Sequence, residues 1–155
     1  MLQKDFAFDA PKNRWWIIGQ WHDQPNAKLG ETWDNFASLS PPALLGLGEL
    51  DVRTAMSLTY GPSNNKLKPH SVGPVFLELQ KWHSITVVIY WSQGRDGSAS
   101  VFVDDLGQPV ICAEGPNMNN DYKHFLKLGM YRHSDIATDN WIYLDDLEIS
   151  EALAP

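Results

Sequence analysis

Short strand-forming segments separated by turn residues run along the whole 155-residue chain, and they constrain its fold more than any other feature. Apolar or alternating runs recur between clusters of Gly, Pro, Asn and Asp, which is typical of an all-β sandwich or barrel. No credible long helix competes, because glycines interrupt the apolar run at 43–48 and two prolines precede it. The expected strands are residues 14–22, 43–47, 51–60, 75–79, 82–92, 98–104, 109–113, 123–133 and 141–150.

The length of the chain favours a single domain. We expect one β-sandwich domain over residues 1–155, with a leader segment at 1–13 and the sandwich core at 14–150. The Asp-Gly pair at 96–97 predicts a hairpin turn. Long polar loops at 61–69 and 114–121 lie where a rigid sheet can present a binding site.

The charge balance disfavours one class of binder. Lys and Arg total 12 against 19 Asp and Glu, which gives a formal net charge of −7. Because such a chain does not neutralise a polyanion wholesale, we expect neither nucleic acid nor a membrane surface as its partner. No stretch reads as a signal peptide or a membrane span, so we expect a soluble protein without an export signal. The lone Cys112 cannot form an internal disulfide and is expected to be a small core residue.

Strand alternation places four polar residues on outward faces. Gln20 and His22 are two residues apart on one strand, so they point the same way. Lys127 and Tyr131 share a face of another strand, opposite the apolar residues at 126, 128 and 130, which are expected to face the core. The sequence therefore predicts a sheet with one apolar face and one polar, aromatic face.

Two short segments carry a resemblance to a known family. Gln20-Trp21-His22 resembles the Gln-x-His strand, and the run from Lys127 to Arg132 resembles the Lys-x-Gly-x-Tyr strand, of the heparin lyase and alginate lyase sandwiches. Supporting similarity at 81–92, 97–105 and 141–149 extends the resemblance over most of the chain and places it closest to the heparin lyases. The resemblance implies a concanavalin-like jelly roll, a β-sandwich of two antiparallel sheets.

The same resemblance implies a chemistry, the β-elimination of uronic-acid polysaccharides. This reaction removes a proton at C5, protonates the leaving oxygen at C4 and needs preorganised donors on the uronate carboxylate. By the resemblance, Gln20 and His22 supply those donors or the base, while Tyr131 is the general acid and a second candidate for the base. Lys127 is placed to favour the ionised phenol or to hold a carboxylate.

Five further residues are weaker candidates for substrate contacts. Arg53 and His133 have strand phases that fit the polar face, and Trp16 and Tyr90 are candidates for stacking on sugar rings. Alternation turns Arg132 to the opposite face unless the strand bulges, so a structural ion pair is its simpler interpretation.

The resemblance also bears on cofactors and partners. No cofactor is required, but a structural Ca²⁺ is compatible with Asp104-Asp105 or Asp145-Asp146, for which ordinary solvation is the simpler interpretation. The implied partner is an acidic polysaccharide or oligosaccharide, and such proteins are usually secreted or periplasmic. Relatives begin with further strands that we expect this chain to lack. The uncovered sheet edge then predicts an oligomer such as a homodimer.

Two other functions remain open on the same fold. A non-catalytic carbohydrate-binding or interaction module would use the polar face without turnover. A sandwich glycoside hydrolase would need two carboxylates facing one cleft, whereas Glu49, Asp51 and Glu78 are scattered.

Overall fold

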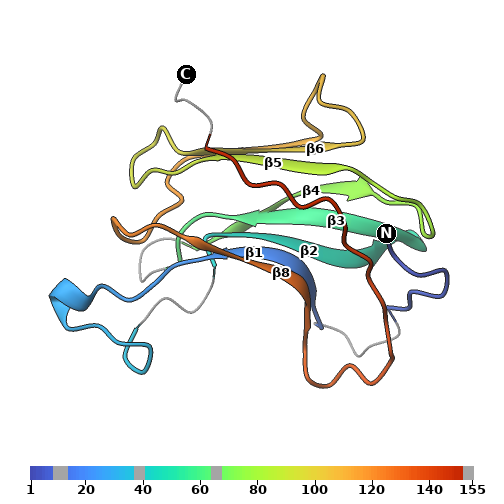
Figure 1. The fold of residues 1–155 in the computed structure, drawn as a ribbon, viewed down its shortest axis with the longest axis horizontal. Coiled ribbons are helices and arrows are strands. Elements are labelled where there is room, and N and C mark those ends of the chain that lie inside the picture. Colours follow the sequence, from blue (N-terminus) through green and yellow to red (C-terminus); the bar gives the residue numbers. More distant parts are fainter. Residues whose placement is uncertain (9–13, 37–40, 64–67, 152–155) are drawn as a thin grey trace.

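The computed structural model describes residues 1–8, 14–36, 41–63 and 68–151, which form two antiparallel β-sheets (Figure 1). The larger sheet has the strand order β4-β3-β2-β1-β8, and the smaller has the order β5-β6-β7. The strands of the larger sheet are β1 (Trp16–His22), β2 (Ala43–Leu50), β3 (Arg53–Tyr60), β4 (His70–Phe76) and β8 (Phe125–Arg132). Those of the smaller sheet are β5 (Ile85–Tyr90), β6 (Ser98–Val103) and β7 (Ile111–Glu114). The 3-10 helix η1 (Ala27–Leu29) follows β1, and none of the described helical segments is long and apolar enough to cross a bilayer.

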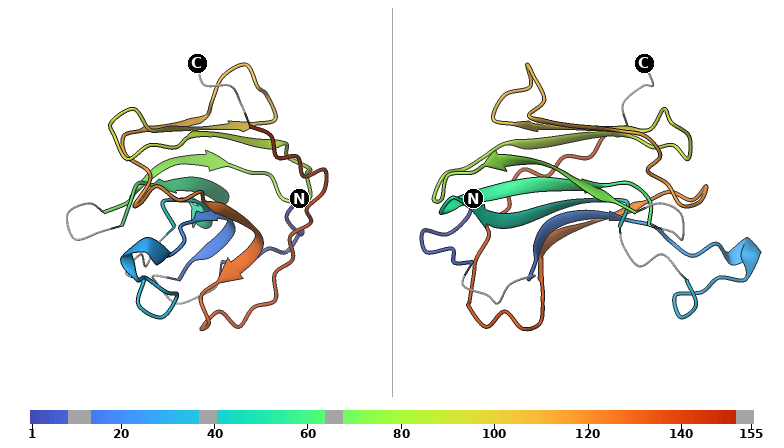
Figure 2. Two further views of the ribbon diagram at one scale, coloured as in Figure 1. Left: turned by 60° about the vertical axis from the view of Figure 1, so that its left-hand side comes forward. Right: turned by 180° about the vertical axis from the view of Figure 1, so that it is seen from behind.

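The smaller sheet covers one face of the larger sheet, and Figure 2 shows both layers from the side and from behind. The core between them is built from alternate residues of facing strands, as the alternating pattern predicts. Met56, Leu58 and Tyr60 of β3 have no exposed surface, and the odd-numbered residues of β5 pack against the same core. Leu2 and Phe6, within the expected leader, are also buried in the core. The all-β prediction is confirmed.

The expected strand at 141–150 is wrong. These residues make one isolated bridge, between Ile142 and Leu2, and join no sheet. The reason is that the backbone of the segment bonds to the N-terminal residues instead: the amides of Gln3 and Tyr143 donate to the carbonyls of Trp141 and Met1 at 3.2 and 2.8 Å. Figure 1 shows this dark red segment passing beside the N-terminus.

Two other expectations need correction. The strand expected at 75–79 instead spans His70–Phe76, with Pro74 inside it, because β4 is an edge strand and tolerates a residue without an N–H. Cys112 is exposed rather than buried, since alternation in β7 turns Ile111 and Ala113 to the core and Cys112 outward.

A bulge in β1 changes which residues share a face. The pairing with β2 shifts between Ile17 and Gly19, which leaves Ile18 as an extra residue. Strict alternation along the strand would place Trp16 and Ile18 on the face of Gln20 and His22, and the bulge separates them from it. Outward residues of β1 are Ile17, Gln20 and His22, and its core residues are Trp16, Ile18 and Trp21.

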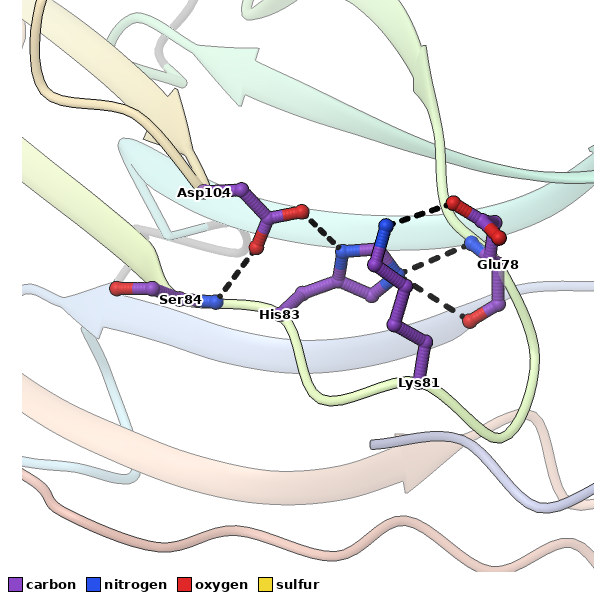
Figure 3. A network of polar contacts seen from close by, with 5 residues as sticks. All are labelled: Glu78, Lys81, His83, Ser84 and Asp104. Atoms are coloured by element: carbon purple, nitrogen blue, oxygen red, sulfur yellow. Dashed lines mark hydrogen bonds and ion pairs between the residues drawn. The ribbon is translucent and has the colours of Figure 1, made fainter.

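A polar network fastens the connection between β4 and β5 to the end of β6 (Figure 3). The Nδ1 of His83 bonds to the Asp104 carboxylate at 2.8 Å, and the Ser84 amide donates to the other oxygen at 3.0 Å. The Glu78 amide donates to Nε2 of His83 at 3.0 Å, and Lys81 pairs with the Glu78 carboxylate at 2.7 Å. These contacts add to the backbone hydrogen bonds of the connection, in which the amides of Leu77 and Gln80 donate to the carbonyls of Thr54 and Leu2, both at 2.9 Å.

Candidate functional site

An open pocket of about 930 Å³ lies on the face of the larger sheet that is turned away from the smaller sheet. We call it the site pocket. Residues of β1, β2, β3 and β8 line it, together with Pro74 of β4 and with Arg14, Trp15 and Pro41. Small residues of β2, Gly46 and Gly48, leave space in its floor. The pocket brings together all four residues of the two family-like segments, Gln20, His22, Lys127 and Tyr131.

Two of these side chains, His22 and Lys127, lie near the ring of Phe125, and Gln20 is the register partner of Lys127. Gln20 pairs with Lys127, and His22 pairs with Phe125, in the antiparallel register of β1 and β8. The imidazole of His22 stacks on Phe125 with 5.6 Å between ring centroids, and the Lys127 Nζ lies 5.3 Å from the same ring. An amide, an ammonium group and an imidazole are therefore presented to one end of the pocket.

The tautomer of His22 follows from its hydrogen bond. Its Nδ1 lies 2.9 Å from the Asp23 carbonyl oxygen. Because a carbonyl only accepts, Nδ1 must carry the proton, and in the neutral ring Nε2 then holds a lone pair. A neutral His22 is thus arranged as a proton acceptor through Nε2.

Tyr131 lies toward the other end of the pocket. It pairs with Ile17 of β1. Ile17 and His22 are five residues apart on this strand, which is about 16 Å at the ordinary rise of a β-strand. Its ring packs against Trp15 with 4.8 Å between centroids, while 57% of the residue remains exposed. His22 and Tyr131 consequently flank the Gln20–Lys127 pair rather than adjoining each other.

A buried contact between an aspartate and a histidine lies directly behind His22. The side chains of Asp23 and His124 are 1% and 2% exposed, and the Asp23 Oδ1 lies 2.5 Å from the His124 Nε2. The side-chain amide of Asn119 donates to the other Asp23 carboxylate oxygen. The His124 ring stacks on Trp91 with 3.8 Å between ring centroids. The pair joins the end of β1 to the start of β8 and holds the residue whose carbonyl orients His22.

The sequence as a whole matches one family model, described as polysaccharide lyase, over residues 1–148. The chain belongs to the polysaccharide lyase family. No curated protein and no solved structure matches it. Membership of this family implies a polysaccharide substrate and agrees with the location of the Gln-x-His and Lys-x-Gly-x-Tyr residues in one pocket.

Two other sequence candidates of this polysaccharide lyase lie outside the site pocket, and a third, Trp16, borders it from the core. Trp16 is 5% exposed, and its ring packs edge-on against Phe8 in the core. Tyr90 is on the outer face of β5, and the Arg53 guanidinium lies 3.2 Å above the ring of Phe76, near the turn between β2 and β3. Neither Tyr90 nor Arg53 lines the site pocket.

Arg132 and His133 follow Tyr131 but turn away from the pocket lining. Arg132 donates to the backbone carbonyl of Thr138, so its structural contact is a hydrogen bond to the main chain. The Nδ1 of His133 accepts from the Asp135 amide at 3.1 Å, and its ring lies 5.8 Å from Trp15. Both residues fasten the segment that follows β8.

Sequence reasoning named only one tryptophan of the adjacent pair. Both Trp15 and Trp16 line the pocket, but Trp15 contacts Tyr131, whereas Trp16 is 5% exposed. It also missed Arg14, which lines the pocket and pairs with Asp135 at 2.5 Å. Both residues lie inside the strand expected at 14–22, but the bulge between Ile17 and Gly19 breaks the alternation that would relate them to Gln20 and His22.

The expected core face of β8 is only partly right. Met130 packs against the core, but Leu128 is 44% exposed. The register between β8 and β1 shifts beyond Leu128, and Gly129 there has φ of 134°, a conformation that favours glycine. An edge strand with such an irregularity does not alternate strictly.

Among residues 1–8, 14–36, 41–63 and 68–151, no group of three or more His, Cys, Asp and Glu is arranged to hold a metal ion. Of the acidic pairs considered for calcium, Asp104 already has both oxygens engaged, by His83 and Ser84.

Proposed function

We propose that this polysaccharide lyase binds an acidic, uronate-containing polysaccharide in the site pocket and cleaves it by β-elimination, as its resemblance to heparin lyases implies. One observation carries the proposal: Gln20 and Lys127 are register partners beside His22. An amide and an ammonium group so placed are suited to a carboxylate.

Each site residue has a part in the proposed reaction. Gln20 and Lys127 donate to the uronate carboxylate, so that charge developing at C5 is stabilised as the proton leaves. The Nε2 of His22 takes the C5 proton, because its Nδ1 proton is committed to the Asp23 carbonyl. Tyr131 gives its proton to O4. The C4–O4 bond breaks, a C4=C5 double bond forms, and no water is consumed.

The pocket geometry imposes a condition on this scheme. Since His22 and Tyr131 flank the Gln20–Lys127 pair, the sugar must be bound between them and both side chains must reach inward to it. We also propose the jelly-roll topology, which is supported by the return of β8 to lie beside β1 in the larger sheet.

The test is ultraviolet absorbance of the unsaturated uronate product with alginate, glucuronan and heparin as substrates. We expect absorbance to rise with at least one of them, and Tyr131→Phe to slow the rise by about 10²- to 10⁴-fold, the usual contribution of a general acid. Tyr143→Phe is the matched control, because Tyr143 is 48% exposed and lies outside the pocket lining. Absence of product with every polymer, together with unaltered behaviour of Tyr131→Phe, would overturn the proposal.

A non-catalytic carbohydrate-binding module is the second candidate. The separation of Tyr131 from His22 along the strands favours it, because catalysis is sensitive to small errors in positioning. Such a module would retain acidic glycans on an array, release no unsaturated product and tolerate Tyr131→Phe.

A further inference from the structure

We infer that Trp33 forms a sugar-stacking subsite just beyond His22, which extends the binding surface past the site pocket. The inference rests on the proposed function, because it assigns the next sugar along the same polysaccharide to a particular residue. The inference predicts that the bound polysaccharide extends beyond the site pocket by at least one sugar.

Trp33 is exposed and is held in place by other rings. It is 63% exposed, yet its ring centroid lies 6.3 Å from that of His22 and 6.0 Å from that of Phe125. Phe36 adds a third, edge-on contact at 6.2 Å. Because His22 lines the site pocket, these contacts make Trp33 continuous with it.

Hydrogen bonds order the turns of the segment that carries Trp33. Asn26 caps η1, because its side-chain Oδ1 accepts a hydrogen bond from the Lys28 backbone amide at 3.0 Å. The backbone amide of Asn26 donates to the Glu31 carboxylate at 2.7 Å. The Phe36 amide donates to the Thr32 carbonyl at 2.9 Å, which closes a turn around Trp33. The indole is therefore presented on structured backbone.

Two contacts tie the base of this segment to the start of β8. The Gln24 side chain donates to the Lys123 carbonyl at 2.6 Å, and the Tyr122 hydroxyl donates to the Asn26 side chain at 3.1 Å. Figures 1 and 2 show the light blue segment projecting past the end of the two sheets. A binding surface fixed in this way loses little freedom when ligand arrives.

The chemistry at Trp33 is apolar rather than ionic. An indole offers a large flat face with little conformational freedom, which suits the C–H face of a pyranose ring. The neighbouring charges at Glu31 and Asp34 are acidic and do not attract a polyanion. The subsite therefore recognises the sugar ring, while Gln20 and Lys127 recognise the carboxylate of the preceding sugar.

The test compares Trp33→Ala with Trp82→Ala in the full chain. Trp82 is a matched control because it is 53% exposed and lies in the connection between β4 and β5. Dissociation constants are measured by calorimetry, at low and high salt, for the best acidic polymer and for its disaccharide and longer oligosaccharides. Trp33→Tyr, which keeps an aromatic face, guards against a merely structural effect.

We expect Trp33→Ala to weaken polymer binding by about 3- to 10-fold, the size of one aromatic contact. Disaccharide binding and the salt dependence should stay as in the wild type, and Trp33→Tyr should restore most of the polymer affinity. Equal polymer affinities for Trp33→Ala and Trp82→Ala would overturn the subsite and leave the proposed function intact. A wild-type protein that binds no acidic polymer would instead overturn the proposed function, and the subsite with it.

Discussion

Gln20 of β1 and Lys127 of β8 lie directly opposite each other on adjacent antiparallel strands and both line the site pocket. Residues paired in this way have Cβ atoms about 5 Å apart, so their polar ends can meet one ligand group. Two short sequence segments from opposite ends of the chain are thus brought together only through the register of the sheet.

Replacement of Lys127 by Met should weaken binding of an acidic polysaccharide about tenfold at low salt, because one ammonium contact to a carboxylate is lost. Added salt should narrow the difference from the wild type, since it screens the interaction that the variant already lacks. Binding titrations at several ionic strengths measure both effects. Lys123→Met is the control, because the Lys123 side chain is 92% exposed and outside the pocket lining. Equal losses in the two variants would show that only net charge matters.

Replacement of His22 by Gln should lower the elimination rate by about 10²- to 10⁴-fold and change polymer affinity little. Glutamine retains a donor for the Asp23 carbonyl but cannot accept the C5 proton as imidazole does. The rate of unsaturated product formation and a separate binding titration distinguish the two effects. His133→Gln serves as the control, because that ring is near Trp15 but outside the pocket lining. The proposed base is wrong if His22→Gln and His133→Gln have the same rate.

The local sequence pattern predicted most strands and named four residues that line one pocket, and its failures have physical causes. Strict alternation holds in β5 but fails in β1, where the extra Ile18 moves Trp16 into the core. The Asp23–His124 pair depends on which strand lies beside β1, and no local spacing encodes that. The segment at 141–150 has a strand-like composition, but residues of the N-terminus take its backbone hydrogen bonds.

Replacement of His124 by Ala should reduce the free energy of unfolding by about 3–5 kcal/mol, the usual cost of removing the partner of a buried charged group. The loss arises because the Asp23 carboxylate stays buried after its partner is removed. Urea denaturation measures it, and His133→Ala is the control at a more exposed site. The double variant Asp23→Ala with His124→Ala should lose less than the sum of the two single losses. Additive losses would contradict the pairing.

Stability toward acid should depend on Asp104. The hydrogen bond from His83, together with the Ser84 amide, holds the pKa of Asp104 below its ordinary value of 3.8 in the folded protein, although burial opposes the shift. The carboxylate therefore contributes stability above pH 3.8, and this contribution is lost as the pH falls through the folded-state pKa, because the unfolded chain binds the proton first.

Thermal melts between about pH 6 and pH 2.5, a range that spans the ordinary aspartate pKa, test this contribution. Asp104→Asn should have a lower melting temperature than the wild type at pH 6. This difference in melting temperature should shrink as the pH falls below 3.8, because the wild type then loses the same interaction. Asp34→Asn, at an exposed carboxylate outside the network of Figure 3, should follow the wild-type curve throughout. A difference between Asp104→Asn and the wild type that stays constant with pH would show that the side chain acts through packing, and that its charge does not stabilise the fold.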